Sequence, residues 1–269
     1  VAAALWYGDR DLRTGFTSST YFNDINYNSI TTLGNAADFG NLSVGRTRSA
    51  ACSNGTYSYR FGGSNGATAT ANITVYNTVD YFANAALGNA SDFGDAQAAH
   101  SDGGGHSDGT TGVVWEGIVG PAGSTSNITN TIDKYTLSTT GNAADFGNLS
   151  VTSNRWNISE CGGGNATRGL FWGGTRIVSP YTPSVNYIDY VTVATPGNSS
   201  DFGDMVAARY AGPVTGAGTD DRALYFGGYT GSAGTRQIDY ITVSTTGNAS
   251  DFGDLSAAIS TPYSGSAAA

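Results

Sequence analysis

The octapeptide Gly34-Asn35-Ala36-Ala37-Asp38-Phe39-Gly40-Asn41 decides the fold, because the chain repeats its pattern five times. The other copies begin at Gly88, Gly141, Gly197 and Gly247. Successive copies stand roughly 50–56 residues apart, a period typical of propeller blades and longer than those of leucine-rich, ankyrin and tetratricopeptide repeats. The repeat therefore predicts several copies of one supersecondary unit.

Two other features recur with the octapeptide. At a constant distance before each of its first glycines, a polar residue stands in a run of β-branched and aromatic residues: Asn26, Asp80, Asp133, Asp189 and Asp239. Further upstream lies an apolar segment that ends in glycine, as in Leu170-Phe-Trp-Gly-Gly174. Together with a small-residue segment after each octapeptide, these features predict four short strands in each repeat.

The two ends of the chain complement each other. The first segment, Ala4–Tyr7, matches the glycine-ended second strand of the other repeats, and the last, Leu255–Ser264, matches the first-strand segment that begins at Leu42. Pairing of these ends in a composite first blade would remove the exposed strand edges of an open ring. We therefore predict one all-β domain over residues 1–269, a five-bladed β-propeller of four-stranded antiparallel blades. Its repeats span approximately 1–42, 43–95, 96–148, 149–204 and 205–254, with 255–269 completing the first blade.

The paired glycines and the aromatic residues in the third and fourth strands resemble the Kelch repeat family over the whole chain. Phenylalanine stands where that family usually has tryptophan, and Gly8-Asp9 and Glu116-Gly117 replace its glycine pair in two repeats. The resemblance implies the fold and no particular function. The near-identical repeats with few Lys and Glu also resemble, more loosely, repeat proteins of phage tails, fibres and capsid decorations.

Composition and charge exclude some classes of partner. The formal net charge of −9 disfavours nucleic acid, whose phosphates are bound by Lys and Arg. No apolar run reaches the ~20 residues of a membrane helix, so membrane insertion is not predicted. Lys134 is the only lysine, and Glu116 and Glu160 are the only glutamates, which argues against surface helices. Cys52 and Cys161 lie in repeats that are not adjacent, and we expect them to be unpaired.

The Asp-Phe-Gly within each octapeptide is interpreted as structural. We expect its aspartate to accept hydrogen bonds from turn amides and its phenylalanine to fill the space between adjacent blades. A kinase interpretation lacks the accompanying lysine strand and catalytic loop. Calcium binding by residues such as Asn35, Asp38 and Asn41 is the remaining alternative. The structural positions are Asp38, Phe39, Asp92, Phe93, Asp145, Phe146, Asp201, Phe202, Asp251 and Phe252.

Two groups of residues carry side chains suited to metal binding or to acid catalysis, but the sequence does not fix the geometry of either site. His100, Asp102, His106 and Asp108 surround three glycines, which would not preorganise metal ligands. Glu116 replaces a glycine of the other repeats and is the one candidate acid for glycoside hydrolysis, which requires a second carboxyl group. We predict no catalytic residue, no metal and no cofactor.

The connections between second and third strands vary among repeats, whereas the turn between third and fourth strands is constant. Variable loops on a rigid scaffold usually carry recognition. We therefore expect a non-enzymatic binding or structural module on an extracellular or virion surface, whose partners are a surface glycan or the other subunits of an assembly. The alternatives are a propeller glycoside hydrolase or lectin, and a Kelch-type intracellular adaptor. Aligning the repeats equates His100 with Arg46 and Arg209, and Arg155 with Arg48. The expected loop-face binding residues are Tyr181, Tyr229, Arg46, His100 and Arg209.

Overall fold

The computed structural model describes residues 4–7, 10–17, 20–66, 73–119, 128–149, 155–156, 163–176, 183–210, 212, 214–215 and 221–259. Within these ranges the chain forms strands and turns, as expected from its β-branched and glycine-rich composition. The same ranges contain no helix long and apolar enough to cross a membrane.

The strands form five larger antiparallel sheets, which we number in chain order. Sheet one contains β1 (Ala4–Tyr7), β2 (Arg10–Thr17), β3 (Thr20–Ser29) and β4 (Ala37–Asn41), and sheet two contains β5 (Ala50–Ser53), β6 (Tyr57–Phe61), β7 (Thr78–Ala83) and β8 (Ser91–Asp95). Sheet three contains β10 (Gly104–Ser107), β11 (Thr111–Trp115), β13 (Thr131–Thr136) and β14 (Ala144–Asn148).

Sheet four has three strands among the described residues, β16 (Arg168–Trp172), β18 (Tyr187–Thr192) and β19 (Ser200–Asp204). Sheet five contains β20 (Val214–Thr215), β21 (Arg222–Phe226), β22 (Thr235–Thr242) and β23 (Ser250–Ile259). Two short ribbons pair β9 (His100–Ser101) with β12 (Ile118–Val119) and β15 (Arg155–Trp156) with β17 (Thr175–Arg176).

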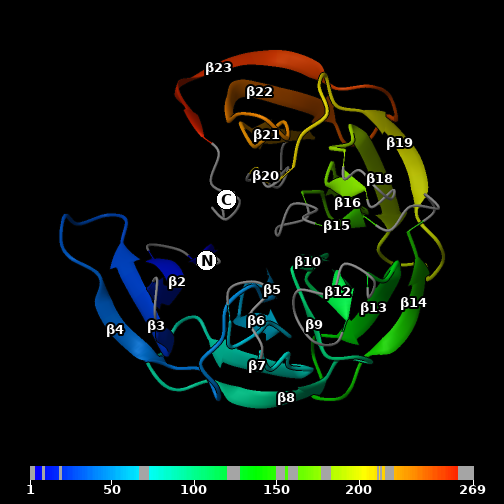
Figure 1. The fold of residues 1–269 in the computed structure, drawn as a ribbon. Coiled ribbons are helices and arrows are strands. Elements are labelled where there is room, and N and C mark those ends of the chain that lie inside the picture. Colours follow the sequence, from blue (N-terminus) through cyan, green and yellow to red (C-terminus); the bar gives the residue numbers. More distant parts are fainter. Residues whose placement is uncertain are drawn as a thin grey trace.

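The larger sheets follow one another around a common centre (Figure 1). Their inner strands are neighbours, since β5 contacts both β1 and β10, and β10 contacts β16. The last strands, β4, β8, β14, β19 and β23, lie on the outside of the ring (Figure 1). Each repeat thus supplies one sheet, as its four-strand pattern predicts.

A β-bulge in the last strand of each sheet explains the Asp-Phe-Gly sequence. In sheet one, Asn26 pairs with Asp38 and Ile25 pairs with Gly40, so Phe39 is the extra residue. The same register shift occurs in the other four sheets. A bulge redirects its side chain, and here the phenylalanine enters the space between sheets. Asp38 accepts a hydrogen bond from the Gly40 amide (3.1 Å), and Asp92 and Asp251 do the same for their own glycines.

The hydrophobic core is divided among the spaces between neighbouring sheets. Phe146 packs with Trp115 of sheet three and Phe171 of sheet four. Each of the other three clusters likewise contains one repeated phenylalanine: Phe39, Phe93 or Phe202. Four of the five repeated phenylalanines are 2–4% exposed, which confirms their predicted place between sheets, whereas Phe252 is 53% exposed. This fifth phenylalanine belongs to the last sheet in the chain, which no later sheet covers in the described residues.

Consecutive octapeptides are also joined by hydrogen bonds. Gly88 N donates to Phe39 O (2.8 Å), Ala90 N to Asn41 O (2.8 Å), and Asn41 N to Asn89 Oδ1 (3.0 Å). The same three bonds join each later pair of consecutive copies at 2.7–3.0 Å. We call this joint the octapeptide clip; its front half is Gly-Asn-Ala/Ser, and its rear half is the Phe-Gly-Asn/Asp of the preceding copy.

The glycine in each rear half is required by this joint. Gly94 has φ +146°, and a Cβ atom there would lie 2.4 Å from Gly141 O of the next front half. The clip thus accounts for the glycine of the rear half and for the asparagine of the front half, whose Oδ1 accepts one of its hydrogen bonds.

The structure corrects the predicted composite first blade. Ala4–Tyr7 is the first strand of sheet one and not the second, which is Arg10–Thr17. Leu255–Ile259 belongs to β23 of sheet five, where Ile259 pairs with Thr235; residues 260–264 lie outside the described part. The second-strand position is taken by β2, which is separated from β3 by two residues and pairs with it as a long hairpin. The glycine-ended pattern of Ala4–Tyr7 gives no sign of this pairing.

We predict that Phe146→Ala lowers the free energy of unfolding by about 3–5 kcal/mol, because the ring is buried between sheets and its loss leaves a cavity. Denaturant unfolding followed by tryptophan fluorescence measures the change. Leu87→Ala, at a side chain that is 57% exposed, is the control and should change stability by less than about 0.5 kcal/mol. Equal effects of the two substitutions would contradict the structural role of the repeated phenylalanine.

Candidate functional site

Buried arginine–aspartate pairs occupy the inner part of three sheets. Arg46 Nη2 lies 3.1 Å from Asp80 Oδ2, and both side chains are fully buried. Arg155 pairs with Asp189 and Arg209 with Asp239 in the same way. Arg155 is therefore the equivalent of Arg46, which corrects its alignment with Arg48.

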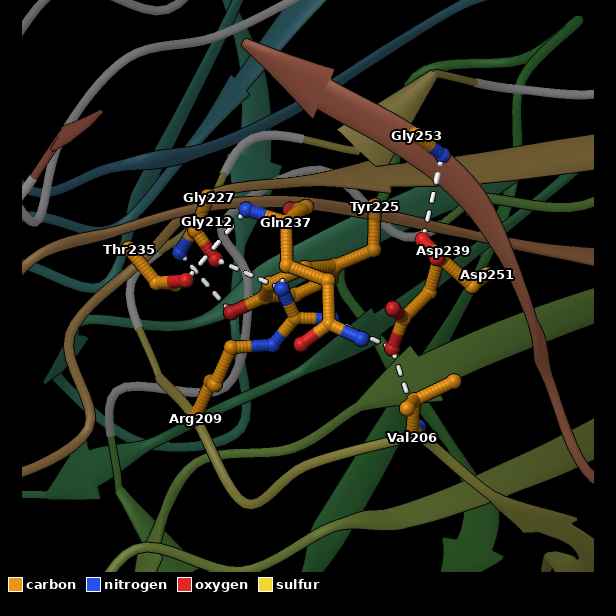
Figure 2. A network of polar contacts seen from close by, with 10 residues as sticks. All are labelled: Val206, Arg209, Gly212, Tyr225, Gly227, Thr235, Gln237, Asp239, Asp251 and Gly253. Carbon is orange, nitrogen blue, oxygen red and sulfur yellow. Dashed lines mark hydrogen bonds and ion pairs between the residues drawn. The ribbon is translucent and has the colours of Figure 1, made fainter. Parts of the chain in front are cut away.

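Each arginine also donates to a backbone carbonyl of the glycine-ended segment of its sheet: Arg46 to Arg60 O, Arg155 to Gly173 O and Arg209 to Gly227 O. Arg209 Nη1 donates to Gly227 O (3.3 Å) and Gln237 O (2.9 Å), while Asp239 accepts a hydrogen bond from Val206 N (3.0 Å) (Figure 2). The guanidinium carbon lies 5.2 Å from the centre of the Tyr225 ring. Burial lowers the pKa of Arg46 and Arg155, and their aspartates oppose that change. The pairs thus connect the segment entering each sheet to that sheet's third strand.

Three expected loop-face residues are therefore internal. Arg46 is 2% exposed, and His100 and Arg209 are fully buried, so none of them lines the rim where we expected a ligand. The error has a physical cause, because each arginine lies in a small-residue segment and its aspartate partner lies 30–34 residues later in the sequence, on the third strand. Tyr181 lies outside the described residues.

Sheet three differs from the other sheets at two positions. His100 stands where Arg46 and Arg209 stand in their repeats, and Glu116 stands where other repeats have the first glycine of the pair. Both Asp133 and Glu116 are buried, and their side chains are hydrogen-bonded to each other. Asp133 also accepts hydrogen bonds from Gln97 and from the Tyr135 hydroxyl, and Glu116 accepts one from Ala98 N (3.2 Å). Burial, with the Asp133 charge, raises the pKa of Glu116 to about 8. A protonated Glu116 beside Asp133 thus limits the buried charge where the other sheets have an arginine.

The histidines do not meet in a common site. His100 Nδ1 lies 3.1 Å from Ala98 O, and burial lowers the pKa of its ring. His106 lies on β10, and its Nε2 is 3.0 Å from Asn165 O, close to the start of sheet four. Asp102 instead pairs with Arg48 at 3.1 Å. Among the described residues, no group of three or more His, Cys, Asp or Glu side chains is arranged to hold a metal ion. Cys52 is buried and unpaired, and Cys161 lies outside the described part.

Tyr229 retains the half-exposed position that a binding residue requires. Its backbone forms two hydrogen bonds with Tyr210, and the two rings meet edge to face with centroids 5.5 Å apart. Burial and the neighbouring Tyr229 raise the pKa of Tyr210. These rings form a small aromatic surface at the connection between β21 and β22.

Two hollows at equivalent positions of sheets three and four were not predicted. Both lie at the hairpin between the third and fourth strands, with volumes of about 460 Å³ in sheet three and about 300 Å³ in sheet four. Threonine hydroxyls, an asparagine amide and a glycine backbone line both, with Lys134 in the first and Tyr190 in the second. The linings are Lys134, Thr136, Thr139, Thr140, Gly141, Asn142 and Ala144, and Tyr190, Val191, Thr192, Thr195, Pro196, Gly197, Asn198 and Ser200.

A signal for these hollows is present in the sequence. Threonines precede the octapeptide at matching positions in both repeats, Thr136 and Thr139 in one and Thr192 and Thr195 in the other. The clip explains the constant asparagine of this turn, whose Oδ1 accepts a hydrogen bond from the preceding octapeptide. It does not account for the threonines.

Comparisons with known proteins bear on the fold. No family model matches the chain, and no curated protein matches it. A solved structure, described as "Structure of YjhT", is similar to the chain with a TM-score of 0.73 at 11% sequence identity. The match covers 99% of this chain and 86% of that chain. That protein has a propeller-like fold, so the chain shares an all-β, propeller-like architecture.

We predict that Arg209→Met lowers the free energy of unfolding by about 3–5 kcal/mol, because it leaves Asp239 buried without its cation. Adding Asp239→Asn, which keeps an acceptor for Val206 N, should recover a large part of the loss. Urea unfolding of the two variants measures both effects. A double variant as unstable as the single one would show that the arginine acts through packing alone.

We predict that stability falls as pH rises from about 4.5 to 8, because folded Glu116, with a pKa of about 8, keeps a proton that the unfolded chain releases near its ordinary pKa of 4.5. Glu116→Gln should remove the Glu116 part of this fall, which for a pKa displaced from 4.5 to about 8 is on the order of 5 kcal/mol. His100 acts in the opposite sense: its lowered pKa costs stability as pH falls below 6.5. Unfolding curves of the parent and of Glu116→Gln at pH 5–9 test this, and parallel profiles of the two proteins would contradict it.

Proposed function

We propose that the chain is a non-enzymatic module that binds a surface glycan through repeated sites on an extracellular or virion surface. The observation that carries this proposal is the recurrence of one hollow, with matching threonine, asparagine and glycine residues, in consecutive sheets. A structural motif repeated on a regular scaffold presents several equal sites, and linked weak sites bind a repetitive ligand with increased avidity. Polysaccharides are repetitive ligands of this kind.

The chemistry of the hollows suits a saccharide. Thr136 and Thr192 are exposed, and their hydroxyls can both donate and accept hydrogen bonds to sugar hydroxyls. In sheet four the half-buried Tyr190 ring adds an apolar surface for a sugar C–H face, and Arg168 lies over this ring at 4.7 Å. Lys134 at the equivalent position of sheet three would favour an anionic sugar there.

We propose that the scaffold for these sites is a single five-bladed, Kelch-like β-propeller domain over residues 1–269. The five larger sheets around a common centre support this architecture (Figure 1). A role as a subunit of a larger particle, as in phage virions, is compatible with the same surface and would replace glycan by neighbouring protein.

A glycoside hydrolase based on Glu116 has less support. Glu116 and Asp133 are hydrogen-bonded to each other and buried, whereas glycosidases hold two carboxyls on opposite sides of the scissile bond. A substrate would have to separate this pair and enter the interior of sheet three.

The proposal is tested by the double variant Thr136→Ala/Thr192→Ala on an array of bacterial and host surface polysaccharides. We expect binding of a polysaccharide by the parent and about tenfold weaker binding by the variant, with unchanged melting, because two exposed hydroxyls are lost. Thr56→Ala, on an exposed turn of sheet two, is the matched control and should bind as the parent does.

Other outcomes assign the function differently. Loss of binding in Tyr229→Ala, with the double threonine variant unaffected, would move the site to the connection between β21 and β22. Hydrolysis by the parent that disappears in Glu116→Gln would replace the binding module by an enzyme. Absence of any binding, together with fixed stoichiometry in a purified particle, would favour the structural subunit.

A further inference from the structure

One position of the third strand differs in sheet three from all the other sheets. The residue that follows the buried polar residue of this strand is Lys134 in sheet three, and in the other four sheets it is Tyr27, Tyr81, Tyr190 or Tyr240. Each of these tyrosines meets the repeated phenylalanine of its own sheet edge to face, with ring centroids 5.6–6.2 Å apart. Lys134 cannot make this ring contact, yet Phe146 is only 2% exposed. The fold therefore tolerates the lysine without requiring it.

The ammonium of Lys134 is a cation without a carboxylate partner. Within the described part of the chain, no ion pair or hydrogen bond involves this ammonium. The residues that lie opposite Lys134 on the two adjacent strands, Val113 and Ala144, are apolar. The residues that line the hollow beside Lys134 include no aspartate or glutamate, although the whole chain carries a net charge of −9. The lining of this hollow is thus positively charged.

The equivalent hollow of sheet four has a different lining. The Tyr190 ring stands there in place of Lys134, and Ser200 in place of Ala144. Arg168 lies over the Tyr190 ring at 4.7 Å and donates to Val243 O (2.7 Å), so its guanidinium already has partners. The two hollows thus offer similar hydroxyl and amide groups, but one adds an unpaired ammonium and the other an aromatic face.

The lining of the hollow in sheet three suits a sugar with a negative charge. A lysine ammonium is a compact point charge with three donors, so it pairs with a carboxylate or a sulfate ester without selecting the plane of that group. Thr136 and Thr139 add hydroxyls that can bond sugar hydroxyls. Asn142, whose Oδ1 accepts a hydrogen bond from Asp95 N, retains its amide NH2 as a donor. The volume of about 460 Å³ lies within the range of small-molecule sites.

We propose that the hollow of sheet three is a subsite for an acidic sugar, whose carboxylate or sulfate pairs with Lys134, and that the hollow of sheet four accepts a neutral sugar on the Tyr190 ring. This inference rests on the glycan-binding function proposed above and specifies its ligand class, an acidic polysaccharide that also contains neutral sugars. Selectivity for charge then resides at Lys134, whereas the threonines of both hollows contribute to binding whatever the charge of the sugar.

The test compares acidic polysaccharides with the same polymers after their charge has been removed. The array of surface polysaccharides is extended with hyaluronan and carrageenan, and each acidic polymer is also applied with its carboxylates reduced or its sulfates removed. We expect the parent to bind an acidic polymer about fivefold more tightly than its neutral form. The group whose removal weakens binding, carboxylate or sulfate, identifies the anion that pairs with Lys134.

Two variants assign this preference to the ammonium. Lys134→Gln should bind the acidic and neutral forms alike, whereas Lys134→Arg, which keeps the charge, should retain the preference. Both variants should melt as the parent does, because Lys134 has no ion pair to lose within the described residues. A preference for the acidic form that persists in Lys134→Gln would overturn the subsite.

Failure of the subsite and failure of the proposed function give different results. Equal affinity of the parent for the acidic and neutral forms of every polymer it binds would overturn the acidic subsite and leave glycan binding in place. Absence of binding to any polymer, acidic or neutral, would overturn the glycan-binding function and the subsite together.

A second measurement observes the lysine directly. Lys134 is the only lysine, so reductive ¹³C-methylation labels one side chain in addition to the α-amino group, and it keeps the charge. Glucuronate and glucose 6-sulfate are the anionic probes, and glucose is the neutral control. We expect the NMR signal of Lys134 to move with at least one anionic probe and to stay in place with glucose. No movement with either anion, or equal movement of the α-amino signal, would overturn the subsite.

Discussion

The burial of one phenylalanine per repeat between neighbouring sheets is the interaction on which the rest of the structure depends. A β-strand side chain points to one face or the other, so reaching the intersheet space at this position takes an extra residue. The bulge supplies it, the following glycine adopts the positive φ angle that the bulge requires, and the preceding aspartate bonds that glycine's amide in three of the sheets. The clip then uses the same backbone to hold the next sheet against the ring.

Electrostatics inside the sheets follows from this packing. A ring of sheets packed face to face leaves little solvent at its inner strands, so each buried aspartate needs a cation or a proton. Sheets two, four and five use arginine, and sheet three uses a protonated Glu116. The charged side chains that looked available for a ligand are thereby buried in the interior, and the polar side chains at the hairpin ends, such as Thr136 and Thr192, remain exposed.

Much of the architecture was predictable from the sequence, because a repeat period and strand alternation are local patterns. The positions of Phe39, Phe93, Phe146 and Phe202 follow from them. The burial of Arg46 and Arg209 does not, since an arginine among small residues carries no local sign of the aspartate that it meets on the third strand. The strand order of sheet one was missed for a related reason. Ala4–Tyr7 has the composition of a second strand, but β2 pairs with β3 and is the second strand of the sheet, so Ala4–Tyr7 is the first. The hollows were missed because the turn that lines them is constant among the repeats, and recognition was expected at the variable connections instead.

The clip has a consequence for how the chain assembles. Its two halves are nearly identical in every repeat, so the hydrogen bonds alone do not distinguish the correct neighbouring sheet from a more distant one or from a second nascent chain. Near-identical repeats are prone to such misassembly. The inner charges differ between sheets, however, and a sheet joined in the wrong order would place an arginine beside Asn26 or leave Asp239 facing Ile259 or His100. The unequal distribution of buried charge therefore disfavours these wrong orders, whereas an exchange among sheets two, four and five, which each pair an arginine with an aspartate, would leave their carboxylates neutralised.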